Sequence, residues 1–104
     1  MVMDKYVNFF SVGDNLEVLK NIHDNVIDLI YIDPPFNTNR NFDDFNDRWE
    51  DEIYFCNDFM APRLREAYRV LNNTGNLVLH VDIKSVHRLK ILLDSIFGIS
   101  NFRN

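Results

Sequence analysis

Residues 26–32 (VIDLIYI), an apolar run interrupted only by Asp28, decide the fold and lead directly into residues 33–36 (DPPF). Such a run predicts a strand buried on both faces, as in parallel sheets that are covered by helices. Proline lacks a backbone N–H and fixes φ, so the strand is expected to end at Asp33. We therefore expect a stiff loop at the carboxyl end of a central strand, where open α/β sheets bind their ligands.

Length and composition indicate one small globular domain. The chain has 104 residues, of which 46% are hydrophobic, and no apolar run is long enough to cross a membrane. The single Cys56 excludes an internal disulfide and fits a reducing compartment, so we expect a cytoplasmic protein. The net charge of −5 argues against a free-standing nucleic-acid binder. Gly13, Gly75 and Gly98 are too far apart to form a phosphate-cradling loop.

The residues before this strand predict a second strand and a short helix. Residues 6–12 (YVNFFSV) have the composition of a strand, and Asp14 is the expected N-cap of the helix that follows. Glu17 stands three residues later, where it completes a capping box. With the strand at 26–32, this order predicts a parallel βαβ unit with a right-handed crossover.

The residues after the prolines predict a second α/β unit. The expected elements are a long surface loop at 37–52, a helix at 51–72, a turn at 72–75, a strand at 76–82 and a helix at 84–97. Pro62 is expected to kink or split the first helix, and Gly98 to end the second. The whole pattern predicts an α/β fold with a three-stranded parallel sheet, which is narrow enough to be part of a larger one.

The motif at residues 33–36 resembles the catalytic motif of the DNA methyltransferases that act on adenine N6 or cytosine N4. Further segments resemble the same family, namely Gly13-Asp14, Asn37-Thr38, 47–49, 59–64, 75–82 and 93–98. Together they are similar to the N-terminal part of the permuted subclass, in which the catalytic motif precedes the cofactor loop, as in restriction-modification methylase subunits. The resemblance implies a partial Rossmann-like fold that uses S-adenosylmethionine.

The resemblance also implies roles for individual residues of the motif. Asp33 and the carbonyl of Pro34 would accept hydrogen bonds from the target amine and hold its lone pair in line with the methyl group. Pro35 would keep these acceptors rigid. Phe36 would stack on a base that has been flipped out of the duplex, and Asn37 would contact the same base. Without this context, the motif is also typical of a plain strand-terminating turn.

The cofactor is expected to meet Asp14 and Asp33. Asp14 has two compatible interpretations, because a helix N-cap needs no ligand and the family resemblance implies a bond to the cofactor. The family's Phe-x-Gly-x-Gly loop and its target-recognition region have no counterpart in the 104 residues. We therefore expect a single partial domain over residues 1–104, from a longer enzyme or a truncated gene, that is inactive alone.

The expected activity is methylation of double-stranded DNA, with adenine favoured because an Asp begins the motif. A cytosine-N4 enzyme more often begins it with Ser, and enzymes for RNA or protein glutamine with Asn. The expected partners are DNA and either a restriction subunit or a second copy. The alternative is a non-catalytic remnant or a module that assembles with a separate partner.

Other chemistry-bearing residues have simpler interpretations. The acidic residues of 43–52 lack the spacing and the glycine of an EF-hand loop and predict a solvated loop, and a loop that closes over the flipped base is the alternative. The three histidines, His23, His80 and His87, lack metal-ligand spacing and are expected to be structural, so no metal site is predicted. Lys84, Arg88 and Lys90 form either a phosphate-binding or a solvated helix face. Cys56 is expected in the core.

Overall fold

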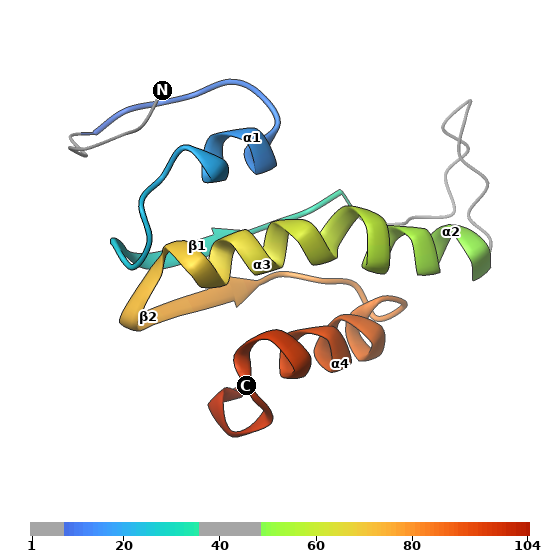
Figure 1. Cartoon of the computed structure of the whole chain (residues 1–104). Helices are drawn as coiled ribbons and strands as arrows, with labels where there is room; N and C mark the ends of the chain where they lie inside the picture. Colours follow the sequence, from blue (N-terminus) through green and yellow to red (C-terminus); the bar gives the residue numbers. More distant parts are fainter. Residues whose placement is uncertain (1–7, 36–48) are drawn as a thin grey trace.

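The computed structural model describes residues 8–35 and 49–104, which form a two-layer α/β unit (Figure 1). Its elements in chain order are α1 (Asn15–Lys20), β1 (Ile27–Ile32), α2 (Trp49–Tyr54), the π-helical segment η1 (Phe55–Met60), α3 (Ala61–Val70), β2 (Leu71–Leu79), α4 (Val86–Phe97) and the short 3₁₀ helix η2 (Ile99–Asn101). One layer is the sheet formed by β1 and β2, and η1, α3 and α4 form the layer beneath it. Helix α1 packs against α3.

The two strands are parallel, as predicted, and their register contains a large irregularity. Leu29 pairs with Asn76 and Ile32 with Leu79, whereas Ile27 pairs with Leu71. Four residues of β2, 72–75, therefore stand opposite the single residue Asp28. The turn predicted at these positions thus lies inside the strand as a bulge, and β2 spans residues 71–79 in place of the predicted 76–82.

Pro62 divides the long helix, as predicted. The residues before it adopt a π-helical turn, in which the N–H of Ala61 donates to the carbonyl of Cys56, five residues back. Proline has no N–H to give, and its ring collides with the carbonyl four residues earlier in a regular helix. A wider turn relieves this conflict, and π-helical turns are known for occurring near functional sites.

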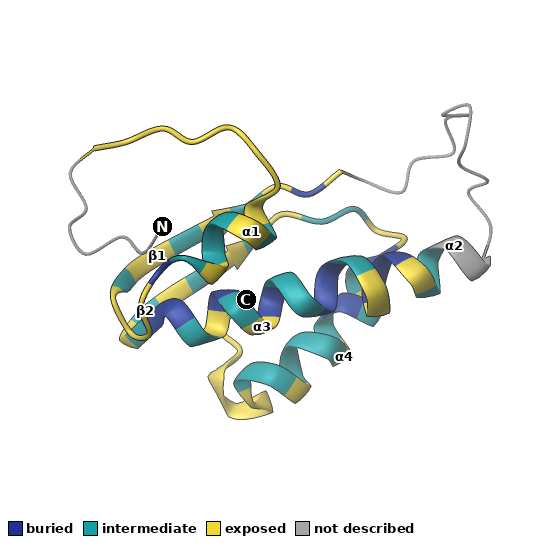
Figure 2. Cartoon of the chain, turned by 45° about the horizontal axis from the view of Figure 1, so that its top comes forward, coloured by how far each residue is buried: buried dark blue, intermediate teal, exposed yellow. Residues whose placement is uncertain are grey.

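The core lies between the helical layer and one face of the sheet. Leu64, Ala67 and Val70 of α3 are completely buried, and these residues follow one side of the helix (Figure 2). Leu89 of α4 joins them. Cys56 is buried as expected, and burial raises the pKa of its thiol.

The opposite face of the sheet is exposed in the described part of the chain, so the expectation that β1 is buried on both faces was wrong. Leu29 is 61% exposed and Tyr31 is 62% exposed, and Val78 of β2 is exposed beside them. Side chains alternate between the faces of a strand, and within the described residues the helices cover only one of those faces.

The described part of the sheet has two strands in place of the predicted three. Residues 8–12, which belong to the strand predicted at 6–12, form no strand, and residues 6 and 7 lie outside the described residues. Phe9, Phe10 and Val12 are all exposed, so no burial supports a hydrogen-bonded ladder there. The βαβ unit predicted from this strand is therefore absent from the described residues.

The helix predicted at the C-terminal end is confirmed. Helix α4 ends at Phe97, and Gly98 follows with a φ of 92°, a left-handed conformation that favours glycine. Of the helices in the described ranges, none combines the length and apolar character that crossing a bilayer demands.

Candidate functional site

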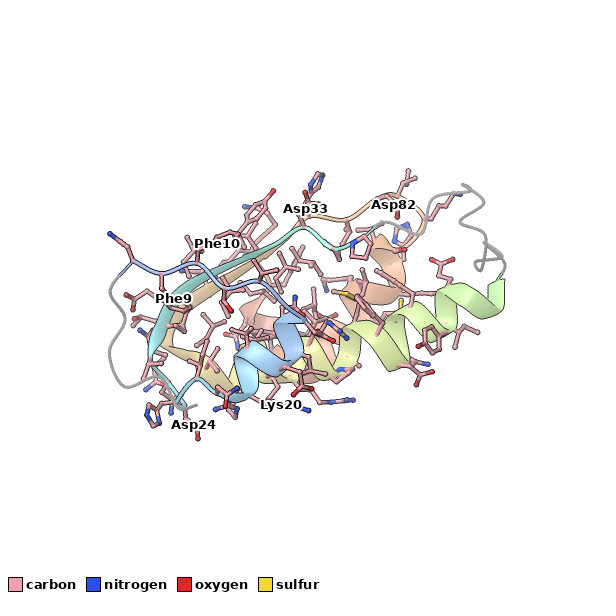
Figure 3. The ribbon with its side chains drawn as sticks, turned by 90° about the horizontal axis from the view of Figure 1, so that it is seen from above. Phe9, Phe10, Lys20, Asp24, Asp33 and Asp82 are labelled. Atoms are coloured by element: carbon pink, nitrogen blue, oxygen red, sulfur yellow. The ribbon has the colours of Figure 1, made fainter. Side chains whose placement is uncertain are left out.

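Both strands end at the same edge of the sheet, and polar residues gather there (Figure 3). Asp33 directly follows β1, and His80 directly follows β2. The N–H of His80 donates to the carbonyl of Ile32, the last residue of β1, over 2.9 Å, so the parallel pairing continues to the residue after β2. The imidazole Nδ1 of His80 thereby lies 3.3 Å from Oδ1 of Asp33, and both side chains are more than half exposed.

The two prolines after Asp33 are placed differently. Pro34 is buried and Pro35 is exposed. The buried ring anchors the loop to the body of the protein while the carboxylate just before it stays open to solvent. Phe36 and Asn37, the residues expected to contact the base, lie outside the described residues, so their roles stay predictions.

Asp14 is the N-cap of α1, as predicted. Its Oδ1 accepts from the backbone N–H of Leu16 over 3.0 Å and from Nη2 of Arg63 over 2.8 Å. The Leu16 N–H first, and then the Arg63 guanidinium, lower the pKa of this carboxyl below its usual value of 3.8. Asp14 is therefore an ionised acceptor at neutral pH. Glu17, the residue expected to complete the capping box, has its carboxylate 3.5 Å from Lys20 Nζ.

Arg63 organises this corner. It belongs to the family-like segment 59–64, but the sequence assigned it no role of its own. Its Nε donates to Oδ1 of Asn15 over 2.9 Å and its Nη1 to the carbonyl of Phe59 over 2.8 Å. The guanidinium carbon also lies 3.8 Å from the centre of the Phe59 ring. Its partner Asp14 is 49 positions away in the chain, so only the folded structure reveals the contact.

Asp14 and Asp33 lie toward the same end of the molecule. Helix α1 begins at the end toward which β1 runs (Figure 1). The contacts recorded for the two carboxylates are separate, since Asp14 binds Arg63 and Asp33 meets His80. Asp14 and Asp33 are therefore two separate carboxylates toward one end of the molecule. Arg63 contacts the first, and His80 contacts the second at the carboxyl edge of the sheet.

The remaining candidates contribute less to this edge. Asp82 lies in the loop after β2, where its Oδ1 accepts from the N–H of Ser85 over 3.1 Å and shapes the entry to α4. Lys90 pairs with Asp94 at 2.7 Å and lies 4.4 Å from the ring centre of Phe102, so its charge is already engaged on the helix. Lys84 and Arg88 also have interactions of their own.

No three metal-ligating side chains converge anywhere in residues 8–35 and 49–104. Asp43, Asp44 and Asp47 of the acidic segment lie outside the described residues, so the interpretation of that segment stays a prediction.

Comparison with known proteins gives a consistent result. The family described as DNA methylase matches residues 27–104. The Mod subunit of the type III restriction-modification enzyme StyLTI from Salmonella typhimurium is 32% identical over 91% of this chain and 19% of its own length. The type II methyltransferase M.KpnI from Klebsiella pneumoniae is 33% identical over 96% of this chain and 26% of its own length. The DNA adenine methyltransferase YhdJ from Escherichia coli is 28% identical over 86% of this chain and 30% of its own length. The chain thus spans less than a third of the length of each of these relatives.

Proposed function

This chain belongs to the DNA methylase family, and from that premise we propose that its full-length protein methylates adenine N6 in double-stranded DNA with S-adenosylmethionine. One observation carries the proposal: an exposed Asp33 follows β1 at the carboxyl edge of a parallel sheet and is fixed from behind by the buried Pro34. A carboxylate anchored in this way is suited to holding a small donor group in a set orientation.

Methyl transfer to an amine mainly requires the protein to position the amine and to stabilise its developing positive charge. The lone pair of an aromatic amine is delocalised into the ring, so the amine is a weak nucleophile. Asp33 and the Pro34 carbonyl accept hydrogen bonds from its two N–H groups, which turns the lone pair out of the ring plane. The nitrogen would then bond to the carbon of the transferred methyl group, and a proton would leave the nitrogen for the Asp33 carboxylate.

S-adenosylmethionine, when bound, supplies a methyl group on a cationic sulfur, and that bond breaks with its electron pair going to sulfur. The residues in this chain fit such a ligand in charge and in hydrogen-bonding type. Asp14 is ionised and Asp33 is exposed, and both accept from the amine and hydroxyl donors that the cofactor carries. We place the family's glycine loop elsewhere in the full-length protein, after the catalytic motif as in the permuted order.

Two features support the finer details of the proposal. The motif begins with Asp33, as is typical of the adenine-directed enzymes that it resembles, and one relative is named as a DNA adenine methyltransferase. Other relatives are Mod subunits of restriction-modification enzymes, so we infer that a restriction subunit accompanies the full-length protein. DNA is the proposed substrate, and a flipped base is the proposed target.

The test is methyl transfer by the full-length protein to duplex DNA, with the methylated nucleosides identified by mass spectrometry. The wild type is expected to form N6-methyladenine, and Asp33→Ala is expected to lose at least about a thousandfold in kcat with an unchanged melting temperature. Asp58→Ala is the matched control, because Asp58 is an exposed carboxylate on η1. N4-methylcytosine as the product would show that the target base is cytosine and not adenine. Full activity of Asp33→Ala would overturn the proposal.

A further inference from the structure

Arg63 is largely buried, although its partner Asp14 is exposed. Its side chain is only 11% exposed, and its three nitrogens donate to three different residues, Asp14, Asn15 and Phe59. A guanidinium that is held by a backbone carbonyl and an aromatic ring has little freedom left. Whatever Arg63 binds is therefore held in a fixed orientation too.

The bonding at Asp14 is one-sided. Both hydrogen bonds recorded for its carboxylate, from Leu16 and from Arg63, go to Oδ1. An ionised carboxylate accepts about four hydrogen bonds over its two oxygens, so Oδ2 keeps its capacity. The N-cap role uses Oδ1 alone and does not require a buried cation beside this carboxylate.

We propose that Arg63 is a positioning residue for the cofactor and acts through Asp14, whose Oδ1 it holds so that Oδ2 accepts a hydrogen bond from S-adenosylmethionine. The inference rests on the proposed function and gives a role to a residue outside the catalytic motif at 33–36. Arg63 also links this site to the π-helical turn, because it binds the Phe59 carbonyl within η1. The Arg63 side chain thus connects the π-helical turn before Pro62 to the carboxylate of Asp14.

The alternative is that Arg63 only fastens α1 to α3, and the chain contains a control for that role. Arg69 of the same helix binds the other end of α1, where its Nη2 donates to the Leu19 carbonyl and its Nη1 to the Ile22 carbonyl, over 2.8 and 2.9 Å. Loss of either arginine loosens the packing of α1 on α3. Only loss of Arg63 disturbs Asp14.

The experiment is a double-mutant cycle on the full-length protein, with equilibrium S-adenosylmethionine binding measured by calorimetry and melting temperature measured alongside. Asp14→Asn is the informative partner, because Asn caps a helix as well as Asp does but lacks the second carboxylate oxygen and the charge. We expect Arg63→Met and Asp14→Asn each to weaken binding about tenfold, and the double variant to be no weaker than either. Arg69→Met is expected to lower the melting temperature and to leave the Kd within about twofold.

Two results would overturn the inference while leaving the proposed function in place. One is equal weakening of binding by Arg63→Met and Arg69→Met. The other is a full further loss when Arg63→Met is added to Asp14→Asn. A wild-type protein that binds no S-adenosylmethionine would instead overturn the proposed function, and this inference with it.

Discussion

Arg63 and Arg69 of α3 hold opposite ends of the same short helix, and their partners differ in kind. Arg69 binds the backbone carbonyls of Leu19, in the last turn of α1, and of Ile22, just after the helix ends. Its charge is shared with Glu66 and Asp24. These two carboxylates also raise the pKa of Arg69, and Glu66 contributes most. Arg63 binds the side chains of Asn15 and Asp14 at the start of the helix. The Asp14 carboxylate is ionised, and both of these hydrogen bonds to it, from Leu16 and Arg63, use Oδ1.

This difference indicates that the two ends of the unit serve different purposes, folding stability at one end and ligand binding at the other. At the amino edge of the sheet, hydrogen bonds are completed within the protein: Arg69 closes α1, and the bulge at 72–75 is closed by the Thr74 N–H, which donates to Oδ1 of Asn72 over 3.0 Å. At the carboxyl edge, Asp14 and Asp33 retain acceptor capacity. Substitutions at the amino edge should therefore change mainly folding stability, and substitutions at the carboxyl edge should change mainly binding and turnover.

The largest expected effect on stability is at Gly75, in the bulge. A Cβ at this position would lie 2.8 Å from Cδ2 of Leu71, 3.0 Å from the Ile27 carbonyl oxygen and 3.2 Å from the Asn72 carbonyl oxygen. Because two of these atoms are backbone, Gly75→Ala should lower the free energy of unfolding by about 1–3 kcal/mol. Urea denaturation of the full-length protein measures this loss.

Asn73→Ala is the control for Gly75→Ala, because Asn73 is exposed in the same bulge and its replacement should change stability by less than about 0.5 kcal/mol. Equal stabilities of the two variants would contradict the crowding at Gly75. A loss of S-adenosylmethionine affinity in Gly75→Ala at a temperature where it is fully folded would break the separation between the two edges.

A smaller effect is expected at His80, on turnover alone. Its imidazole lies 3.3 Å from the Asp33 carboxylate, close enough to limit the orientations of that group. His80→Ala should lower kcat about tenfold, or about 1.4 kcal/mol, and leave the melting temperature unchanged because the side chain is more than half exposed. Single-turnover kinetics, compared with His87→Ala on the exposed side of α4, measure the effect. Identical rates for the two variants would remove His80 from the site.

The smallest expected effect is a pH dependence of stability that is due to Asp14. The folded state lowers the pKa of this carboxyl, so its contribution to stability is present above the usual value of 3.8 and is lost as the pH falls through the folded-state value. Wild type should therefore melt above Asp14→Asn at neutral pH, and the gap should narrow below pH 3.8. Melting curves of both proteins between pH 2 and 7 measure the gap, and a constant gap would contradict the ionised cap.

Local patterns predicted the helices and the parallel pairing because each depends on neighbours in the chain. The caps at Asp14 and Gly98, the break at Pro62 and the apolar run at β1 act over a few residues. The third strand and the full burial of β1 were predicted wrongly, because strand pairing and face coverage depend on segments far away in the chain. The exposed Leu29 and Tyr31 have the composition of buried residues and no cover within the described residues.

The candidate site divides in the same way. Asp33 and Asp14 were found from a motif and a capping pattern, both of which are local. His80 was expected to be structural, and it lies beside Asp33 because parallel pairing aligns the ends of β1 and β2. Arg63 lies in the family-like segment 59–64, which assigns it no partner, so only the packing of α1 against α3 connects it to Asp14.

The most direct measurement is turnover per folded molecule for Asp33→Ala and Gly75→Ala, made on the full-length protein with S-adenosylmethionine and duplex DNA. Asp33→Ala should keep the wild-type melting temperature and form no detectable N6-methyladenine. Gly75→Ala should melt at a lower temperature and turn over at the wild-type rate at a temperature where it is folded. Methylation by Asp33→Ala at the wild-type rate would contradict the account at its centre.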